Sequence, residues 1–145
     1  MALLDLMPNA VYTFLEMVDQ GLWDGCSLVM KATHVLKAIP LPYDQSQDPN
    51  ITANIFVDKN LNGPIFKEYS HTFPHTPYTL GFTGVDISSF YINTEDIADI
   101  HAGDSTFGKV VDGFGTLECV DAARKENGIW LRDRIGIKST KIIVL

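Results

Sequence analysis

Short apolar segments separated by turn-forming residues fill the second half of the chain. Their β-branched and aromatic residues favour strands, and the Gly, Pro, Asn and Asp residues between them leave no room for long helices. Strands are predicted over residues 54–57, 78–83, 89–93, 105–111, 129–131, 135–137 and 141–145. Strands this short and this closely spaced favour an antiparallel barrel or sandwich.

Two segments have helical spacing instead. The first lies between Pro8, which suits a first helical turn, and Gly21, which suits a helix end. Its apolar residues recur on one face at Val11, Phe14, Leu15 and Val18. A second, shorter helix is predicted over 113–123. Together with the strands, these helices fit one mainly β domain over the whole chain, 1–145.

Charge and composition exclude several functions. The net charge is −7 and the eleven Lys and Arg residues are scattered, so no basic stripe is available for nucleic acid. No uncharged apolar stretch reaches the ~18 residues that cross a bilayer, so no membrane-spanning segment is expected. Cys26 and Cys119 are isolated, and we expect two buried thiols.

Three segments carry a resemblance to a known family. The first runs from the helix at Pro8 into G-L-W-D-G-C at 21–26, and the second is the strand pair within 78–93. The third is F-G-K-V-V-D-G at 107–113. In this order and spacing they resemble the cyclophilin family of peptidyl-prolyl cis-trans isomerases, whose F-G-K-V-V-E-G is nearly identical to the third segment.

The resemblance implies an eight-stranded antiparallel β-barrel capped by two α-helices. The family's first strand should precede Met1, and only 2–6 remains as an opening strand. We therefore expect either a fragment of a longer protein or a domain that closes in another way.

The resemblance also implies which residues would act. Prolyl isomerisation must lower a rotation barrier of roughly 20 kcal/mol, which requires a hydrogen-bond donor near the prolyl nitrogen and an apolar pocket for the ring. Cyclophilins use an arginine as the donor, and that position falls on Met30, whose thioether donates nothing. The next residue, Lys31, should point to the opposite face of its strand.

The other positions of the family's peptide groove are also largely replaced. They fall on Val35, Leu36, Ala38, Phe82, Ser89, Tyr91, Asp99, Ile100 and Asp104. The apolar floor is retained (Val35, Leu36, Phe82, Tyr91, Ile100), but both glutamine positions, now Ala38 and Ser89, have lost their amides. If Asp99 and Asp104 line the groove, they favour basic peptides.

Three hypotheses for function follow. The first is a peptide- or protein-binding module with little or no isomerase activity, whose partner contains proline. The second is a weakly active isomerase in which another residue, such as His34, donates the hydrogen bond. The third is a structural domain of a larger protein.

No cofactor or metal is expected. Asp58, Asn60 and Asn62 match the start of a calcium loop, but Tyr69 occupies its twelfth position and no helix is predicted before Asp58. A turn between strands is the preferred interpretation. His71 and His75 are separated by Pro74, so two loop histidines are favoured over a pair of metal ligands on a helix.

Overall fold

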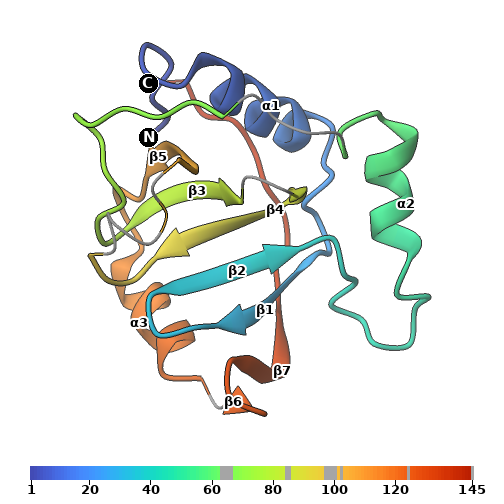
Figure 1. Cartoon of the computed structure of the whole chain (residues 1–145). Coiled ribbons are helices and arrows are strands. Elements are labelled where there is room, and N and C mark those ends of the chain that lie inside the picture. Colours follow the sequence, from blue (N-terminus) through green and yellow to red (C-terminus); the bar gives the residue numbers. More distant parts are fainter. Residues whose placement is uncertain (63–66, 84–85, 97–100, 102, 124, 145) are drawn as a thin grey trace.

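The computed structural model describes residues 1–62, 67–83, 86–96, 101, 103–123 and 125–144. Within them, seven strands form one antiparallel sheet in the order β5-β3-β4-β2-β1-β7-β6 (Figure 1). The strands are β1 (Ser27–Lys31), β2 (Val35–Ile39), β3 (Thr79–Thr83), β4 (Asp86–Asn93), β5 (Ser105–Lys109), β6 (Lys125–Glu126) and β7 (Trp130–Gly136). The helices are α1 (Pro8–Asp19), α2 (Ile51–Asp58) and α3 (Phe114–Asp121).

The sheet is not closed by hydrogen bonds among the described residues, so the predicted eight strands and closed barrel are not confirmed. The opening strand predicted over 2–6 is reduced to a single bridge between Ala2 and Gly108, followed by a turn. Residues 141–144 form no strand either. Beside this edge a cleft of about 450 Å³ opens between α1, β5 and the C-terminal segment, with Val11, Phe107 and Ile142 in its walls.

The predicted N-terminal helix is confirmed as α1, and it packs on one face of the sheet. Phe14 is central to this contact, because its ring lies 4.9 Å from that of Phe107 and 5.3 Å from that of Phe90. The main core is built on this face from buried residues of α1, the sheet and the loop after α1. Burial of such aromatic side chains is the largest favourable term in folding a domain of this size.

The first turn of α1 is capped from a distant part of the chain. Met7, which precedes the helix, offers no side-chain hydrogen bond. Instead the carboxylate of Glu68 accepts hydrogen bonds from the backbone N–H groups of Asn9 (3.1 Å) and Ala10 (2.9 Å). A negative charge there also complements the positive end of the helix dipole.

The strand predicted over 54–57 is wrong, since these residues lie in α2. Three consecutive apolar residues, Ile55 to Val57, suggested a strand, but only Phe56 is buried, with its ring 5.1 Å from Trp23. Its inward neighbour is Thr52, four residues earlier, which is the spacing of one helical face. The structure therefore places a helix directly before Asp58, contrary to the sequence-based expectation.

Directly paired residues show that the sheet has two different faces. Phe90, Phe82 and Ala38 belong to the main core beneath α1. Tyr91 and Val35 form a second cluster, with Met30 packed against it. Successive strand residues point to opposite sides, so this second cluster lies on the face away from α1, which we call the outer face.

A β-bulge decides which residues of β1 reach the outer face. Leu28 pairs with Ala38, but the next pair joins Met30 to Lys37, so Val29 is an extra residue. The pairing of β1 with β7 is interrupted at the same place: Leu28 pairs with Ile135, but Met30 pairs with Trp130. The strands predicted over 129–131 and 135–137 are therefore one strand, β7, with an irregular middle.

The two cysteines differ. Both are free, and Cys26 is buried, but Cys119 is exposed on α3, so the expectation of two buried thiols is wrong for Cys119. Burial, with the negative charge of Asp24, raises the pKa of Cys26 to about 12. In the part of the chain that the structure describes, no helix has the length and apolarity needed to span a bilayer.

Candidate functional site

A row of six paired residues crosses the outer face. Met30 is opposite Lys37, Lys37 is opposite Tyr91, and Tyr91 is opposite Gly81. The row continues to Thr106 on β5 at one end and to Trp130 on β7 at the other. Directly opposed residues of antiparallel strands share a face, so all six side-chain positions point outward.

Tyr91 lies at the middle of this row and is almost completely buried, with 1% of its surface exposed. Its ring covers Gly81, where an added Cβ would come within 2.6 Å of the tyrosine Cζ. The hydroxyl donates a hydrogen bond to Asp104 Oδ2 at 3.2 Å. Burial, and next the charge of Asp104, raise the pKa of Tyr91 well above its usual value, so the hydroxyl remains protonated.

His75 lies beside Tyr91 and is fully buried. Its Nε2 donates to the backbone carbonyl of Asp104 at 3.2 Å, and the hydroxyl of Thr106 lies 3.0 Å from the ring nitrogens. Burial lowers the pKa of His75, and the hydrogen bond to Asp104 only partly opposes this. The ring is therefore neutral at pH 7.

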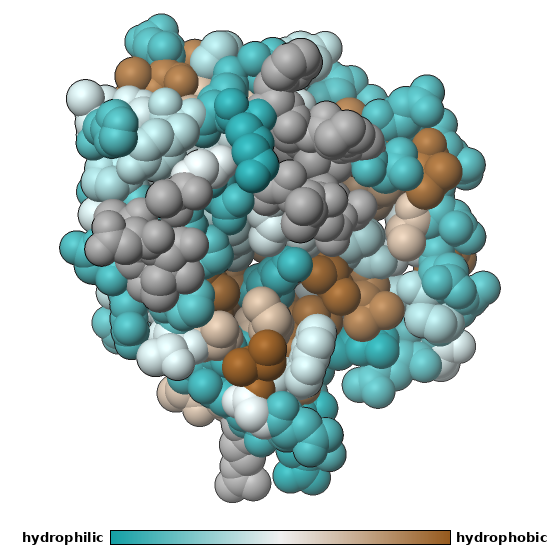
Figure 2. Space-filling model, in the orientation of Figure 1, coloured by the Kyte–Doolittle hydropathy of each residue, from teal (hydrophilic) through white to brown (hydrophobic). Residues whose placement is uncertain are grey.

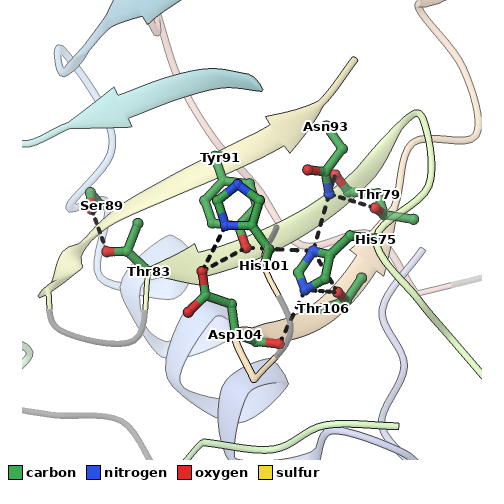
Figure 3. A network of polar contacts seen from close by, with 9 residues as sticks. All are labelled: His75, Thr79, Thr83, Ser89, Tyr91, Asn93, His101, Asp104 and Thr106. Carbon is green, nitrogen blue, oxygen red and sulfur yellow. Dashed lines mark hydrogen bonds and ion pairs between the residues drawn. The ribbon is translucent and has the colours of Figure 1, made fainter. Parts of the chain in front are cut away.

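His101 and Asp104 complete the group that covers Tyr91 (Figure 3). His101 Nδ1 is 3.0 Å from Asp104 Oδ2, and the His101 ring centroid is 4.9 Å from that of Tyr91. On the other side of His75, the Asn93 amide donates to Thr79 Oγ1 at 2.7 Å. We call His75, Tyr91, Asn93, His101, Asp104 and Thr106 the outer-face cluster.

The structure unites only some of the predicted groove residues. Met30, Val35 and Tyr91 lie together, and Asp104 joins them through Tyr91. Ser89 is also buried, at 3.3 Å from Thr83 Oγ1.

Three predicted groove residues, two of the apolar floor and one glutamine position, are on the other side of the sheet. Ala38 and Phe82 belong to the main core, and Leu36 is opposite Ile92, which packs there too. The strict alternation of β2 and β3 turns them away from Tyr91, so they do not face the outer surface. Asp99 and Ile100 lie outside the described residues.

His34, the alternative donor, has its ring centroid 5.3 Å from that of His101. Burial and the neighbouring His101 lower the pKa of His34, against the opposing charge of Glu95. A neutral imidazole is a weaker hydrogen-bond donor than a guanidinium.

Sequence reasoning missed Lys37, Trp130, His75 and His101. Lys37 follows Val35 by two residues, so the alternation of a strand places both on one face. His75 does lie in a loop, as the sequence predicts, but the residues that bury it come from β4 and β5.

No group of three or more His, Cys, Asp or Glu side chains in the described residues is arranged to hold a metal ion. The calcium candidates Asp58, Asn60 and Asn62 are exposed at the end of α2, and Gly63 of the same pattern lies outside the described residues.

Comparisons with known proteins identify a sequence family and a shared fold. The family model of cyclophilin type peptidyl-prolyl cis-trans isomerases matches residues 3–142. No curated protein matches the chain in sequence.

Two solved structures of a Cryptosporidium parvum cyclophilin type peptidyl-prolyl cis-trans isomerase are similar to the chain. One, determined in the presence of the dipeptide Ala-Pro, has a TM-score of 0.77 and 16% identity, and the match covers 100% of this chain and 91% of that chain. The other has a TM-score of 0.73 and 16% identity, with 95% and 85% covered.

Proposed function

The chain belongs to the cyclophilin-type peptidyl-prolyl cis-trans isomerase family, and on that premise we propose that it is a peptide- or protein-binding module with little or no isomerase activity. The observation that supports this proposal is the position of Met30. It faces outward beside Lys37 and packs against the cluster of Val35 and Tyr91, where the family resemblance expects an arginine.

Methionine at this position removes the donor that the reaction needs. The transition state requires a hydrogen bond toward the prolyl nitrogen, and a thioether has no N–H or O–H to give. Loss of one such positioned donor costs about 3–4 kcal/mol, or 10²–10³ in rate. His34 is a poor substitute for the arginine, because burial and the neighbouring His101 lower its pKa and a neutral imidazole donates more weakly than a guanidinium.

Two observations support retention of peptide binding. Met30 is partly exposed on the outer face, next to Trp130, which has half of its surface exposed. Exposed aromatic and thioether groups of this kind suit a proline ring. In addition, a solved relative of the same fold was studied in the presence of Ala-Pro.

The test is exchange NMR on a panel of X-Pro peptides, with and without the protein. We expect the peptide signals to shift while cis/trans exchange stays at the uncatalysed rate. Met30→Arg should accelerate exchange, whereas the control Met30→Gln should not, because only arginine restores a charged donor.

Two outcomes would contradict the proposal. Exchange well above background in the unaltered protein would mean that it is an active isomerase. Unshifted peptide signals together with unchanged exchange would favour a structural domain without a peptide site.

A further inference from the structure

The accessible part of the outer-face row is not its centre. Tyr91 is buried under His101 and held by Asp104, so its ring is not available to a ligand in this structure. Trp130 is 50% exposed, and Met30 and Lys37 are partly exposed. These three are consecutive across β7, β1 and β2. Apolar surface gathers over β1 and β2 on the face shown in Figure 2, with polar residues around it.

Lys37 is the charge within this accessible part. Its ammonium has no hydrogen bond or ion pair with any described residue, although the side chain is partly buried. Lys31, by contrast, lies 3.1 Å from Asp121 Oδ1 on α3. Lys37 lies between Met30 and Tyr91 in the row, so its ammonium is available to pair with an anion from outside.

The acid nearest the row is already engaged. Asp104 Oδ2 accepts hydrogen bonds from the Tyr91 hydroxyl and from His101 Nδ1, so this carboxylate is engaged within the outer-face cluster. The expectation that Asp104 would favour basic peptides is not supported by these contacts, and Lys37 favours the opposite charge.

We propose that Trp130, Met30 and Lys37 form a recognition site for a proline residue next to a carboxylate. This inference rests on the proposed peptide-binding function and names the class of peptide. The indole of Trp130 and the thioether of Met30 accept the pyrrolidine ring, and the ammonium of Lys37 pairs with the carboxylate.

The spacing of the strands fits such a ligand. Neighbouring strands are about 4.8 Å apart, so Trp130 and Lys37, on strands separated by β1, are roughly 10 Å apart. An extended dipeptide spans about 7 Å, and a carboxylate side chain adds the remainder. The carboxylate has two sources, an Asp or Glu beside proline or the free C-terminus of a chain that ends in proline.

Binding can be measured from the indole signals in ¹H–¹⁵N spectra. The protein has two tryptophans, and Trp23 is fully buried, so only the Trp130 signal should shift. The ligands are Ac-Ala-Asp-Pro-Ala-NH₂, its Asn-Pro analogue, and Ac-Ala-Ala-Pro with either a free or an amidated C-terminus. The first two peptides form one matched set, with and without an Asp carboxylate, and the last two form another, with and without a C-terminal carboxylate. In at least one set we expect the charged peptide to bind about three- to tenfold more tightly, as for one partly exposed ion pair.

Variants assign this preference to Lys37. Lys37→Met should remove it and Lys37→Arg should keep it, while Lys138→Met, at an exposed lysine outside the row, should change nothing. Trp130→Leu should weaken charged and neutral peptides equally. If Lys37→Met loses the preference for the charged peptide of one set, that set identifies whether the carboxylate is a side chain or a C-terminus. The backbone spectrum of each variant shows whether it is folded.

Two results separate this inference from the proposed function. Equal affinity for the charged and neutral members of both pairs, or a preference that survives Lys37→Met, overturns the inference and leaves peptide binding intact. No shift with any peptide overturns both.

Discussion

Tyr91 and Gly81 depend on one another. The tyrosine ring occupies the space where any other residue at 81 would have its Cβ, at 2.6 Å from the ring. This contact requires glycine for its lack of a side chain and not for a special backbone conformation.

Gly81→Ala should therefore destabilise the protein by about 1–3 kcal/mol, the usual cost of overpacking. Urea unfolding measures the loss. The matched control is Gly115→Ala, since nothing lies within 4 Å of a Cβ there and alanine favours the surrounding helix α3. Adding Tyr91→Leu to Gly81→Ala should recover part of the loss, and strictly additive effects would contradict the predicted contact.

His75 should make stability depend on pH. Its pKa in the folded protein is lowered by burial, below the ~6.5 of an unfolded chain. The folded state therefore binds fewer protons, and its stability is complete above about pH 6.5 and falls as the pH drops below that value. Urea midpoints at pH 7 and 5 should differ less in His75→Gln than in the unaltered protein. His71→Gln, at an exposed histidine, should keep the original difference.

Single residues of the outer-face cluster were poorly predictable. His75, Asn93 and Thr106 are separated in sequence, and their contacts depend on how a loop, β4 and β5 come together. Met30 and Tyr91 were found because the family pattern marks their positions. The alternation of β2 puts Lys37 on the same face as Val35, but its position beside Tyr91 follows from the register of β2 with β4, which the sequence does not give.

At the scale of elements, the N-terminus of α1 is capped by a residue distant in sequence. Glu68 supplies the acceptors that the N-terminal residues of α1 lack, and its own N–H donates to Ser105 Oγ at 2.9 Å. Glu68 thus joins α1, through its carboxylate, to the start of β5, through its backbone N–H.

Glu68→Ala should cost about 1–2 kcal/mol, the range for loss of a helix cap, and Glu68→Gln should cost less because one acceptor remains. Thermal or urea unfolding checks the order of the two. Glu118→Gln, at an exposed glutamate of α3 without a cap role, serves as the control. Equal stability of Glu68→Ala and the unaltered protein would mean that water caps α1 equally well.

Elements with a clear period were predicted well, as α1, α3, β3 and β5 show. The strand prediction over 54–57 was wrong for a physical reason. Ile55, Phe56 and Val57 suit a strand locally, and the helix α2 is favoured by the burial of Phe56 against Trp23, a contact distant in sequence. The predicted barrel closure depended on pairing at the sheet edges, which the order of segments does not specify.

For the molecule as a whole, the reactivity of the two thiols measures how often the core opens to solvent. Cys119 is exposed and should react with a thiol reagent in the native state, whereas Cys26 is buried and its pKa is raised to about 12. Only the thiolate reacts, so Cys26 should be labelled only when the core opens.

Mass spectrometry after a short labelling pulse should find one modification per molecule, on Cys119. Cys119→Ser should remove that label, and the remaining reaction at Cys26 should accelerate in urea in parallel with global unfolding. Rapid labelling of Cys26 in native buffer would show that the core opens locally instead.

The bulge at Val29 has a consequence for changes in chain length. Removal of one residue from a regular strand turns every later side chain to the opposite face. Val29, however, is the additional residue between the pairs Leu28–Ala38 and Met30–Lys37, so a chain without it keeps both pairs and Met30 still faces outward. This position therefore tolerates a single-codon deletion better than the neighbouring strand positions, and homologues that differ in length by one residue in β1 can present the same outer face.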